Sequence, residues 1–153
     1  MAQLTIHCFV GELTLFEEDN KIVSLEWGRG LPIPHNNTPS LLLKHASDQL
    51  TAYFKNQLQV FDIPTFPAGS AFQKRVLTQI QNIPFGETRT YSEIATSLKS
   101  WARPVGNACG HNPIPIIIPC HRVVGKNGLG GYSGEGGLHT KRLLLSFERL
   151  LEN

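Results

Sequence analysis

The 153-residue chain lacks a long apolar run, a Cys-x-x-Cys pair and a low-complexity tail. Its longest apolar stretch, 114–119, falls far short of the roughly 18 to 20 residues that a membrane span needs, so we expect no transmembrane helix. The first residues do not join a basic segment to a long apolar one, so we expect no signal peptide. The three cysteines, Cys8, Cys109 and Cys120, are an odd number that argues against a disulfide scaffold. Together these absences favour the reducing cytoplasm.

Charge is scarce and unevenly distributed. Only 17% of the residues are charged and 41% are hydrophobic, which is enough for the core of one domain or two small lobes. The net charge of +2 divides into −3 for residues 1–69 (four basic, seven acidic) and +5 for residues 70–153 (ten basic, five acidic). The second half is therefore the candidate surface for a polyanion, although an ordinary solvated surface explains this difference equally well.

The first half predicts a small lobe of strands and one helix over residues 1–66. Short apolar bursts separated by turn-forming residues over 4–27 predict a three-stranded antiparallel meander. Apolar residues at three- and four-residue spacing over 40–56 predict an amphipathic helix that covers the sheet. The Pro- and Gly-containing residues 57–69 predict a linker.

The second half predicts a helical lobe. Ser70 and Gln73 have the spacing of a capping box that opens a helix. Thr90 or Ser92 is expected to cap a second short helix, and a third is expected over about 104–111. Three short helices, with a tight connection between the last two, predict helix-turn-helix topology.

A final helix is predicted over about 138–151. Its expected buried side consists of apolar residues: Leu143, Leu144, Phe147, Leu150 and Leu151. We therefore predict an α/β fold class, with the strand-helix lobe followed by a helical lobe over 69–153.

Cys120 and His121 follow a rigid, proline-bracketed approach over 112–119. A thiolate is a strong nucleophile, and an imidazole oriented by a carboxylate can take the thiol proton. Adjacent side chains diverge in an extended chain, so His121 is expected to reach the sulfur through a water or a turn. Glu148, on the inner side of the last helix, is the candidate orienting acid. An isolated pair of this kind is more often a core cysteine beside a surface histidine.

The sequence Pro-Cys-His-Arg-Val-Val at 119–124 matches in full the active-site signature of a known family. Further matching segments surround it: 84–91, 103–106, 112–113, 131–134 and 141–148. On these motifs the chain resembles the O6-alkylguanine-DNA alkyltransferases, also called methylated-DNA-protein cysteine methyltransferases. The resemblance covers residues 70–150, whereas residues 1–69 resemble the family's N-terminal lobe only in size and in strand-helix order.

The resemblance implies a ribonuclease H-like N-terminal lobe and a winged-helix-like C-terminal lobe. It implies DNA repair by direct reversal, in which a cysteine takes the alkyl group from the sixth-position oxygen of a guanine flipped out of double-stranded DNA. The resulting thioether has no ready leaving path, so each molecule reacts once. Neither a cofactor nor a metal is required. O4-alkylthymine is left open as a further substrate. The implied protein acts as a monomer, with its helix-turn-helix in the minor groove.

The resemblance also assigns the reacting groups. Cys120 resembles the alkyl acceptor, and His121 with Glu148 resembles the water-linked relay that deprotonates it. Asn112 resembles the hinge asparagine that ties the turn before the active site to the helical segment.

The resemblance assigns a second set of residues to substrate and DNA. Tyr91 resembles the tyrosine that donates to guanine N3, and Arg103 resembles the arginine finger that fills the gap in the base stack. Tyr132 and Ser133 resemble the substrate-pocket loop, and Val123 is counted with the substrate-binding residues.

The third helix is expected to expose small residues that allow close approach to DNA: Ala102, Gly106 and Ala108. The minor groove is only about 6 Å wide, so small side chains suit it. Binding is then expected to depend mainly on phosphate contacts and on salt.

Departures from the family and rival functions remain. Asn107 lies inside the third helix, Cys109 is a second thiol near the site, and residues 134–137 form a loop that looks long for the family. One cysteine with scattered histidines is poor metal spacing, so no zinc site is expected at the N-terminal candidates: His7, Cys8, His35 and His45. One rival function is a thiol hydrolase that uses the same cysteine, histidine and glutamate and regenerates its thiol. Another is a non-catalytic protein that binds alkylated DNA.

Overall fold

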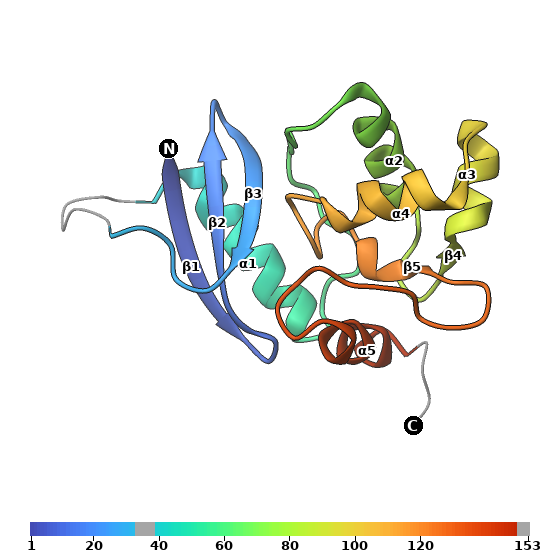
Figure 1. The fold of residues 1–153 in the computed structure, drawn as a ribbon. Coiled ribbons are helices and arrows are strands. Elements are labelled where there is room, and N and C mark those ends of the chain that lie inside the picture. Colours follow the sequence, from blue (N-terminus) through green and yellow to red (C-terminus); the bar gives the residue numbers. More distant parts are fainter. Residues whose placement is uncertain (33–38, 150–153) are drawn as a thin grey trace. The chain divides into compact units, whose positions relative to one another are not determined.

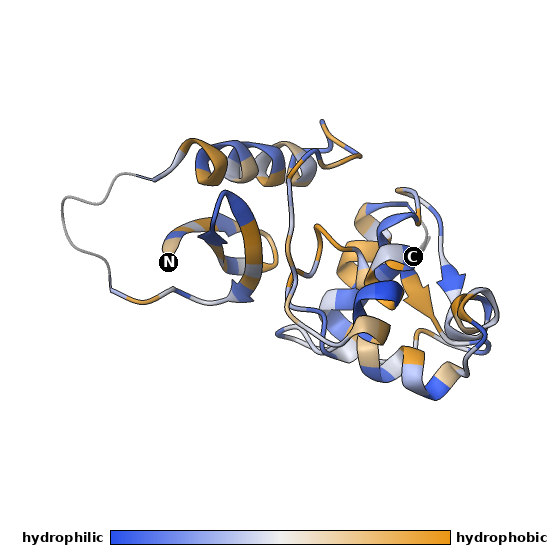
Figure 2. Ribbon diagram, turned by 90° about the horizontal axis from the view of Figure 1, so that it is seen from above, coloured by the Kyte–Doolittle hydropathy of each residue, from blue (hydrophilic) through white to orange (hydrophobic). Residues whose placement is uncertain are grey.

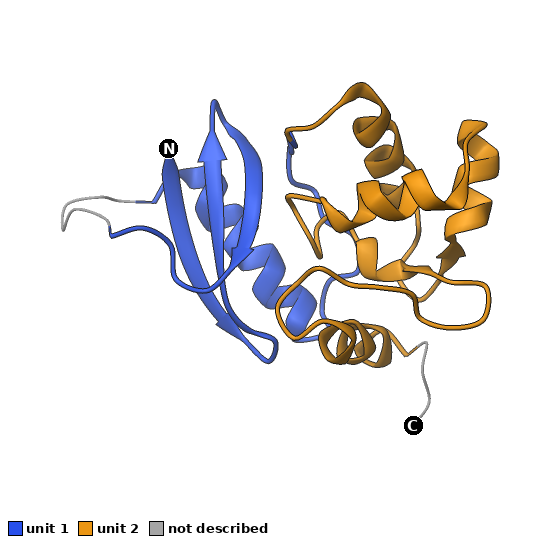
Figure 3. Cartoon of the chain, viewed as in Figure 1, with its two compact units in different colours: residues 1–67 blue, residues 68–153 orange. Residues whose placement is uncertain are grey.

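The computed structural model describes residues 1–32 and 39–149, and the chain divides into two compact units, residues 1–67 and 68–153 (Figures 1 and 3). The units contain both strands and helices, which confirms the predicted α/β class. In the described part of the chain, no helix combines the length and the apolar character that a membrane crossing requires.

Unit 1 is an antiparallel meander covered by one helix, as predicted. Strands β1 (Ala2–Cys8), β2 (Gly11–Glu18) and β3 (Lys21–Trp27) pair in chain order. Asp19 and Asn20 join β2 to β3 with φ of 52° and 61°, left-handed values that suit a tight hairpin turn. Hydrophobic and hydrophilic positions mix along these strands in Figure 2, as expected for a sheet with one buried face.

Helix α1 (Leu41–Phe54) packs on β1 and β2. The Ser40 hydroxyl caps it by accepting from the Leu43 amide at 3.1 Å. Its buried face confirms the predicted apolar stripe and consists of Leu43, Ala46, Leu50 and Tyr53.

Unit 2 begins with helices α2 (Ala71–Gln81), α3 (Tyr91–Leu98) and α4 (Ala102–Gly110). Helices α2 and α3 both pack against α4, and a short turn joins α3 to α4, so the helix-turn-helix prediction is confirmed. The third helix starts two residues earlier than the predicted 104.

The second half of unit 2 carries one short turn, a two-residue strand and the last helix. These are the 3-10 turn η1 (Cys120–Arg122), strand β5 (Val123–Val124) and α5 (Leu138–Phe147). Strand β5 pairs in parallel with β4 (Arg89–Thr90), a contact that the sequence did not predict. This pairing brings the segment after the cysteine beside the start of α3.

Of the two hydrogen bonds in the capping box predicted at Ser70, only the one to the Ser70 side chain forms, so the predicted box is wrong. The Ser70 hydroxyl accepts from the Gln73 amide at 3.1 Å, but the Gln73 side chain donates to the His111 carbonyl at 2.8 Å. The complete box opens α3, where Thr90 and Glu93 exchange side-chain to backbone hydrogen bonds of 3.0 Å. Thr90, of the two alternatives, is therefore the cap.

The predicted buried side of α5 needs correction. The buried positions of the helix and its C-cap include two charged residues: Thr140, Lys141, Leu144, Leu145 and Glu148. Of the predicted positions Leu144 is buried, and Phe147 is only partly buried. Leu143 lies off this face and is 36% exposed, so its predicted burial is wrong. The helix ends at Phe147, and predicted positions Leu150 and Leu151 lie outside the described residues.

Candidate functional site

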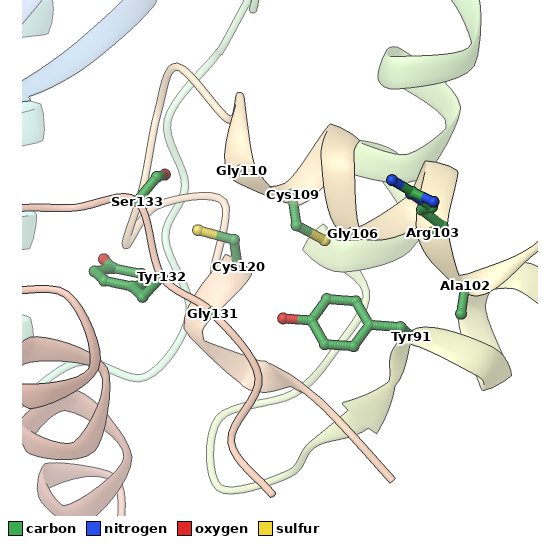
Figure 4. Close-up of a pocket in the computed structure, with 10 residues that line it drawn as sticks. All are labelled: Tyr91, Ala102, Arg103, Gly106, Cys109, Gly110, Cys120, Gly131, Tyr132 and Ser133. Carbon is green, nitrogen blue, oxygen red and sulfur yellow. The ribbon is translucent and has the colours of Figure 1, made fainter.

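A pocket of about 490 Å³ in unit 2 gathers most of the predicted site residues (Figure 4). The predicted residues that line it are Tyr91, Ala102, Arg103, Gly106, Cys120, Tyr132 and Ser133. Cys109, Gly110 and Gly131 complete the lining. The pocket therefore joins three parts of the sequence: the start of α3, one face of α4, and the turn and loop that follow residue 119.

A braced turn presents Cys120 to this pocket. Asn112 donates from Nδ2 to the Ile118 carbonyl at 2.8 Å and accepts at Oδ1 from the Ile114 amide at 3.0 Å. Within the turn that Asn112 closes, Ile116 has a φ of 72°, an unfavourable value for a β-branched residue. Strain of this kind persists only where surrounding contacts enforce it, and it concentrates at functional sites. Asn112 thus closes the turn before Cys120, and its expected hinge role towards the helical segment stays a prediction.

The environment of Cys120 holds it as a thiol at rest. Its side chain is almost fully buried, and burial raises the thiol pKa. A hydrogen bond from Asn112 and the ammonium charge of Lys141 act in the opposite direction. A nucleophilic Cys120 therefore needs a base to take its proton.

His121 lies against a buried carboxylate that can orient it. Its Nε2 is 2.8 Å from Glu148 Oε2, and both side chains are fully buried. Burial lowers the pKa of His121 although Glu148 acts to raise it, so the ring is neutral near pH 7. Because Glu148 remains ionised, Nε2 carries the proton and donates, which leaves the lone pair on Nδ1. Among the described residues Nδ1 has no hydrogen-bond partner.

Arg122 is a site residue that sequence analysis missed. Its guanidinium donates two hydrogen bonds to the carboxylate of Glu148, from Nε to Oε1 at 2.8 Å and from Nη2 to Oε2 at 3.0 Å. The third donor, Nη1, bonds the Ile83 carbonyl at 2.7 Å. Burial acts against ionisation of Glu148, but the hydrogen bonds from His121 and Arg122 prevail and lower its pKa to about 2. The only sequence signal was the place of Arg122 directly after the histidine.

Lys141 is the second missed residue, and it is fully buried. Its Nζ donates to the carbonyls of Val123 at 2.6 Å, Gly131 at 2.9 Å and Leu129. It also lies 3.5 Å from the Tyr91 hydroxyl, and burial lowers its pKa to about 8. Lys141 thus ties β5 and the loop after it to the tyrosine at the pocket. Its helical spacing from Glu148 could have revealed it, since both lie on the face of Leu144.

Two tyrosine rings flank Cys120 in the view of Figure 4. Burial raises the pKa of both Tyr91 and Tyr132, so both hydroxyls are protonated. Gly130 passes so close to Tyr91 that a Cβ there would lie 2.6 Å from the hydroxyl oxygen, and its φ of 74° also favours glycine. The loop backbone therefore packs directly on the Tyr91 ring.

The predicted exposed face of α4 is only partly right. Ala102 and Arg103 are exposed and line the pocket with Gly106, whereas Ala108 is buried on the opposite side, so its predicted exposure is wrong. The side chain of Val123 is fully buried and Val123 is not among the lining residues, so its expected part in substrate binding stays a prediction.

Cys109 faces the same pocket from α4. Burial raises its pKa to about 12, with a further rise from Cys120. It is therefore a protonated thiol of low reactivity. Over residues 1–32 and 39–149, no three His, Cys, Asp or Glu side chains converge as a metal site needs. The zinc candidate His35 lies outside this range.

Comparisons with known proteins agree with this geometry. Residues 71–150 match the family model of the 6-O-methylguanine DNA methyltransferase DNA binding domain, and residues 1–67 match that of its ribonuclease-like domain. A methylated-DNA–protein-cysteine methyltransferase of Mycolicibacterium paratuberculosis is 52% identical over 68% of this chain and 64% of its own length. A constitutive one of Bacillus subtilis is 37% identical over 92% of this chain and 91% of its own length. The solved structure of Mycobacterium tuberculosis OGT in complex with DNA has a TM-score of 0.83 at 41% identity, covering 96% of this chain and 92% of that one.

Proposed function

The chain belongs to the 6-O-methylguanine DNA methyltransferase family, and on that premise we propose that it repairs DNA by transferring an alkyl group from O6-alkylguanine to its own Cys120. The observation that carries the proposal is the pocket in which Cys120 lies beside the buried His121, Glu148 and Arg122 arrangement. A thiol in a pocket that has room for a nucleobase, with an oriented imidazole next to it in the chain, suits attack on a saturated carbon.

In the proposed reaction, one water molecule links the Cys120 thiol to Nδ1 of His121, which takes the proton. Glu148 stabilises the imidazolium that forms, and Arg122 keeps Glu148 ionised. The thiolate attacks the alkyl carbon, the new sulfur–carbon bond replaces the carbon–oxygen bond, and guanine departs with the electron pair. The Tyr91 hydroxyl donates a hydrogen bond to N3 of the leaving guanine. The protein remains alkylated, so each chain acts once.

We propose that DNA binds along the exposed face of α4, from its minor-groove side, with the damaged guanine flipped into the pocket. Arg103 fills the gap in the base stack, and Tyr132 and Ser133 hold the flipped base. One chain supplies every residue of this site, so a monomer suffices. The reaction needs a free thiol at Cys120, which fits a reducing compartment such as the cytoplasm.

The test is peptide mapping by mass spectrometry after incubation with a duplex that contains one O6-methylguanine. We expect one methyl group per chain, on Cys120, and complete loss of transfer in Cys120→Ser with retained binding to the duplex. Cys8→Ser, which alters a thiol of unit 1, is the matched control and should transfer normally. Repeated turnover with a regenerated thiol would instead indicate a hydrolase, and binding without transfer would indicate a lesion-binding protein.

A further inference from the structure

Trp101 is a large aromatic residue that the fold does not bury. It is 75% exposed and directly precedes Ala102 and Arg103, which line the pocket. An indole gains most of its stabilisation from burial, and tryptophan is usually well buried. Its exposure at the edge of the proposed DNA-facing surface therefore needs a reason other than packing.

Trp101 also occupies a position where local stability favours another residue. It is the N-cap of α4 and forms no side-chain capping hydrogen bond. The N-caps of α1, α2 and α3 are Ser40, Ser70 and Thr90, and each accepts a hydrogen bond from its helix. Helix α4 begins without this stabilisation, as does α5 at Gly137, where glycine has no side chain to offer. A residue that stabilises the fold neither by burial nor by capping is a candidate for a functional role.

The charges around Trp101 suit a nucleic acid. Lys99 and Arg103, two residues away on either side, are both exposed. Lys99 has a φ of 54°, a left-handed value at which glycine is the usual residue, so the turn keeps a cation where glycine would be easier. The sequence contains no Asp or Glu from Ile94 to Gly134. The turn between α3 and α4 thus presents an indole between two cations, a combination that binds phosphates and stacks on bases.

We propose that Trp101 is a second DNA-inserting residue, which enters the minor groove beside Arg103 and stacks on a base next to the flipped guanine. The proposal rests on the proposed function and extends it to the flipping step. A flat ring enters a narrow groove edgewise, and apolar wedges of this kind unstack neighbouring base pairs. Unstacking by Trp101 lowers the cost of extruding the damaged base, while Arg103 fills the gap.

The decisive variant is Trp101→Ser, because serine is a good N-cap. A purely structural role for this position predicts a protein that is at least as stable and equally active. The proposal predicts an equal or higher melting temperature together with slower repair: single-turnover transfer from an O6-methylguanine duplex should fall roughly tenfold at saturating DNA. Trp101→Phe should recover most of the rate. Leu41→Ser, at an exposed apolar residue that starts α1, is the matched control and should keep the wild-type rate.

A binding measurement separates this proposal from the proposed function. The chain has two tryptophans, so Trp27→Phe combined with Cys120→Ser leaves Trp101 as the only indole in a protein that cannot transfer. Stacking predicts quenching of its emission when an unmodified or damaged duplex is added. Unchanged emission, or an unchanged rate in Trp101→Ser, overturns the insertion role even if Cys120 accepts alkyl groups. An emission change that depends on protein concentration without DNA assigns the ring to contact with a second copy and also overturns it. Quenching without any transfer by the wild-type chain would contradict the proposed function alone.

Discussion

The two units bury different kinds of side chains. In the described part of unit 1, the only buried polar side chain is Thr14, whose hydroxyl donates to the Gly28 carbonyl at 2.7 Å. Unit 2 buries several polar groups, three of them charged: His121, Arg122, Thr140, Lys141 and Glu148. Unit 1 is thus organised by apolar burial, whereas unit 2 places ionised groups inside its core.

This difference shows where the fold buries charged groups at a cost in stability. Removing charged groups from water is expensive, and a well-packed apolar core of the same volume is often more stable than a buried ion pair. The buried charged groups of unit 2 position residues of the site: Glu148 bonds His121, Arg122 holds Glu148, and Lys141 bonds the loop that packs on Tyr91. The cost therefore falls where the proposed chemistry needs fixed charges and fixed geometry.

The largest expected difference between the units comes from breaking one ion pair in each. Arg122→Ala leaves the carboxylate of Glu148 buried without its cationic partner, and we expect the free energy of unfolding of unit 2 to fall by about 3–5 kcal/mol. Arg29→Ala breaks the exposed pair with Glu12, whose N···O distance is 3.1 Å, and should cost unit 1 less than about 1 kcal/mol. Urea titration followed by NMR, with amide signals from each unit read separately, measures both. Equal losses of unfolding free energy in the two units would contradict this difference between the buried and the exposed ion pair.

A smaller effect should appear as a pH dependence confined to unit 2. The pKa of Glu148 is about 2 in the folded chain and near 4.5 when unperturbed, so the unfolded chain binds more protons between these values. The stabilisation, about 3 kcal/mol at most, is complete above pH 4.5 and is lost as the pH falls towards 2. The same titration at a series of pH values should show this loss in unit 2. Glu148→Gln should flatten it, and a persistent slope in that variant would assign the effect to other carboxyl groups.

The smallest effect should be the same in both units. Ser40 caps α1 in unit 1 and Thr90 caps α3 in unit 2, each through one hydroxyl near the surface. Because capping is local, Ser40→Ala and Thr90→Ala should each lower the free energy of unfolding by about 1 kcal/mol. Thermal melting of the two variants tests this expectation. A much larger loss for Thr90→Ala would mean that the capping box also supports the neighbouring pocket residue Tyr91.

The elements were largely predictable because their signals are local. The meander, the helix after Ser40 and the three short helices follow from periodicity and turn residues, and each is present. The errors came from groups whose partners lie far along the chain. Gln73 left its expected capping box for the carbonyl of His111, 38 residues away, and the β4–β5 pair joins residues more than 30 positions apart.

In the candidate site, too, the residues with local signals were predicted and those that depend on distant partners were not. The motif at 119–124 identified Cys120 and His121, and the last helix supplied Glu148 as their partner. Ala108 was misplaced because a residue's membership of a motif does not say which face of its element it occupies. Arg122 and Lys141 were missed because charged residues are expected at the surface, and only their contacts reveal why they are buried.

By itself the sequence determined the meander, the main helices, the candidate nucleophile Cys120 and the family resemblance, since these depend on residue type and on short spacing. Only the tertiary structure decided how the cysteine is controlled. A hydrogen bond acts over about 3 Å, so the grip of Arg122 on Glu148 and of Lys141 on three carbonyls exists only once distant segments have packed together. The same packing left Trp101 outside the core, directly before Ala102 and Arg103, which line the pocket of the cysteine.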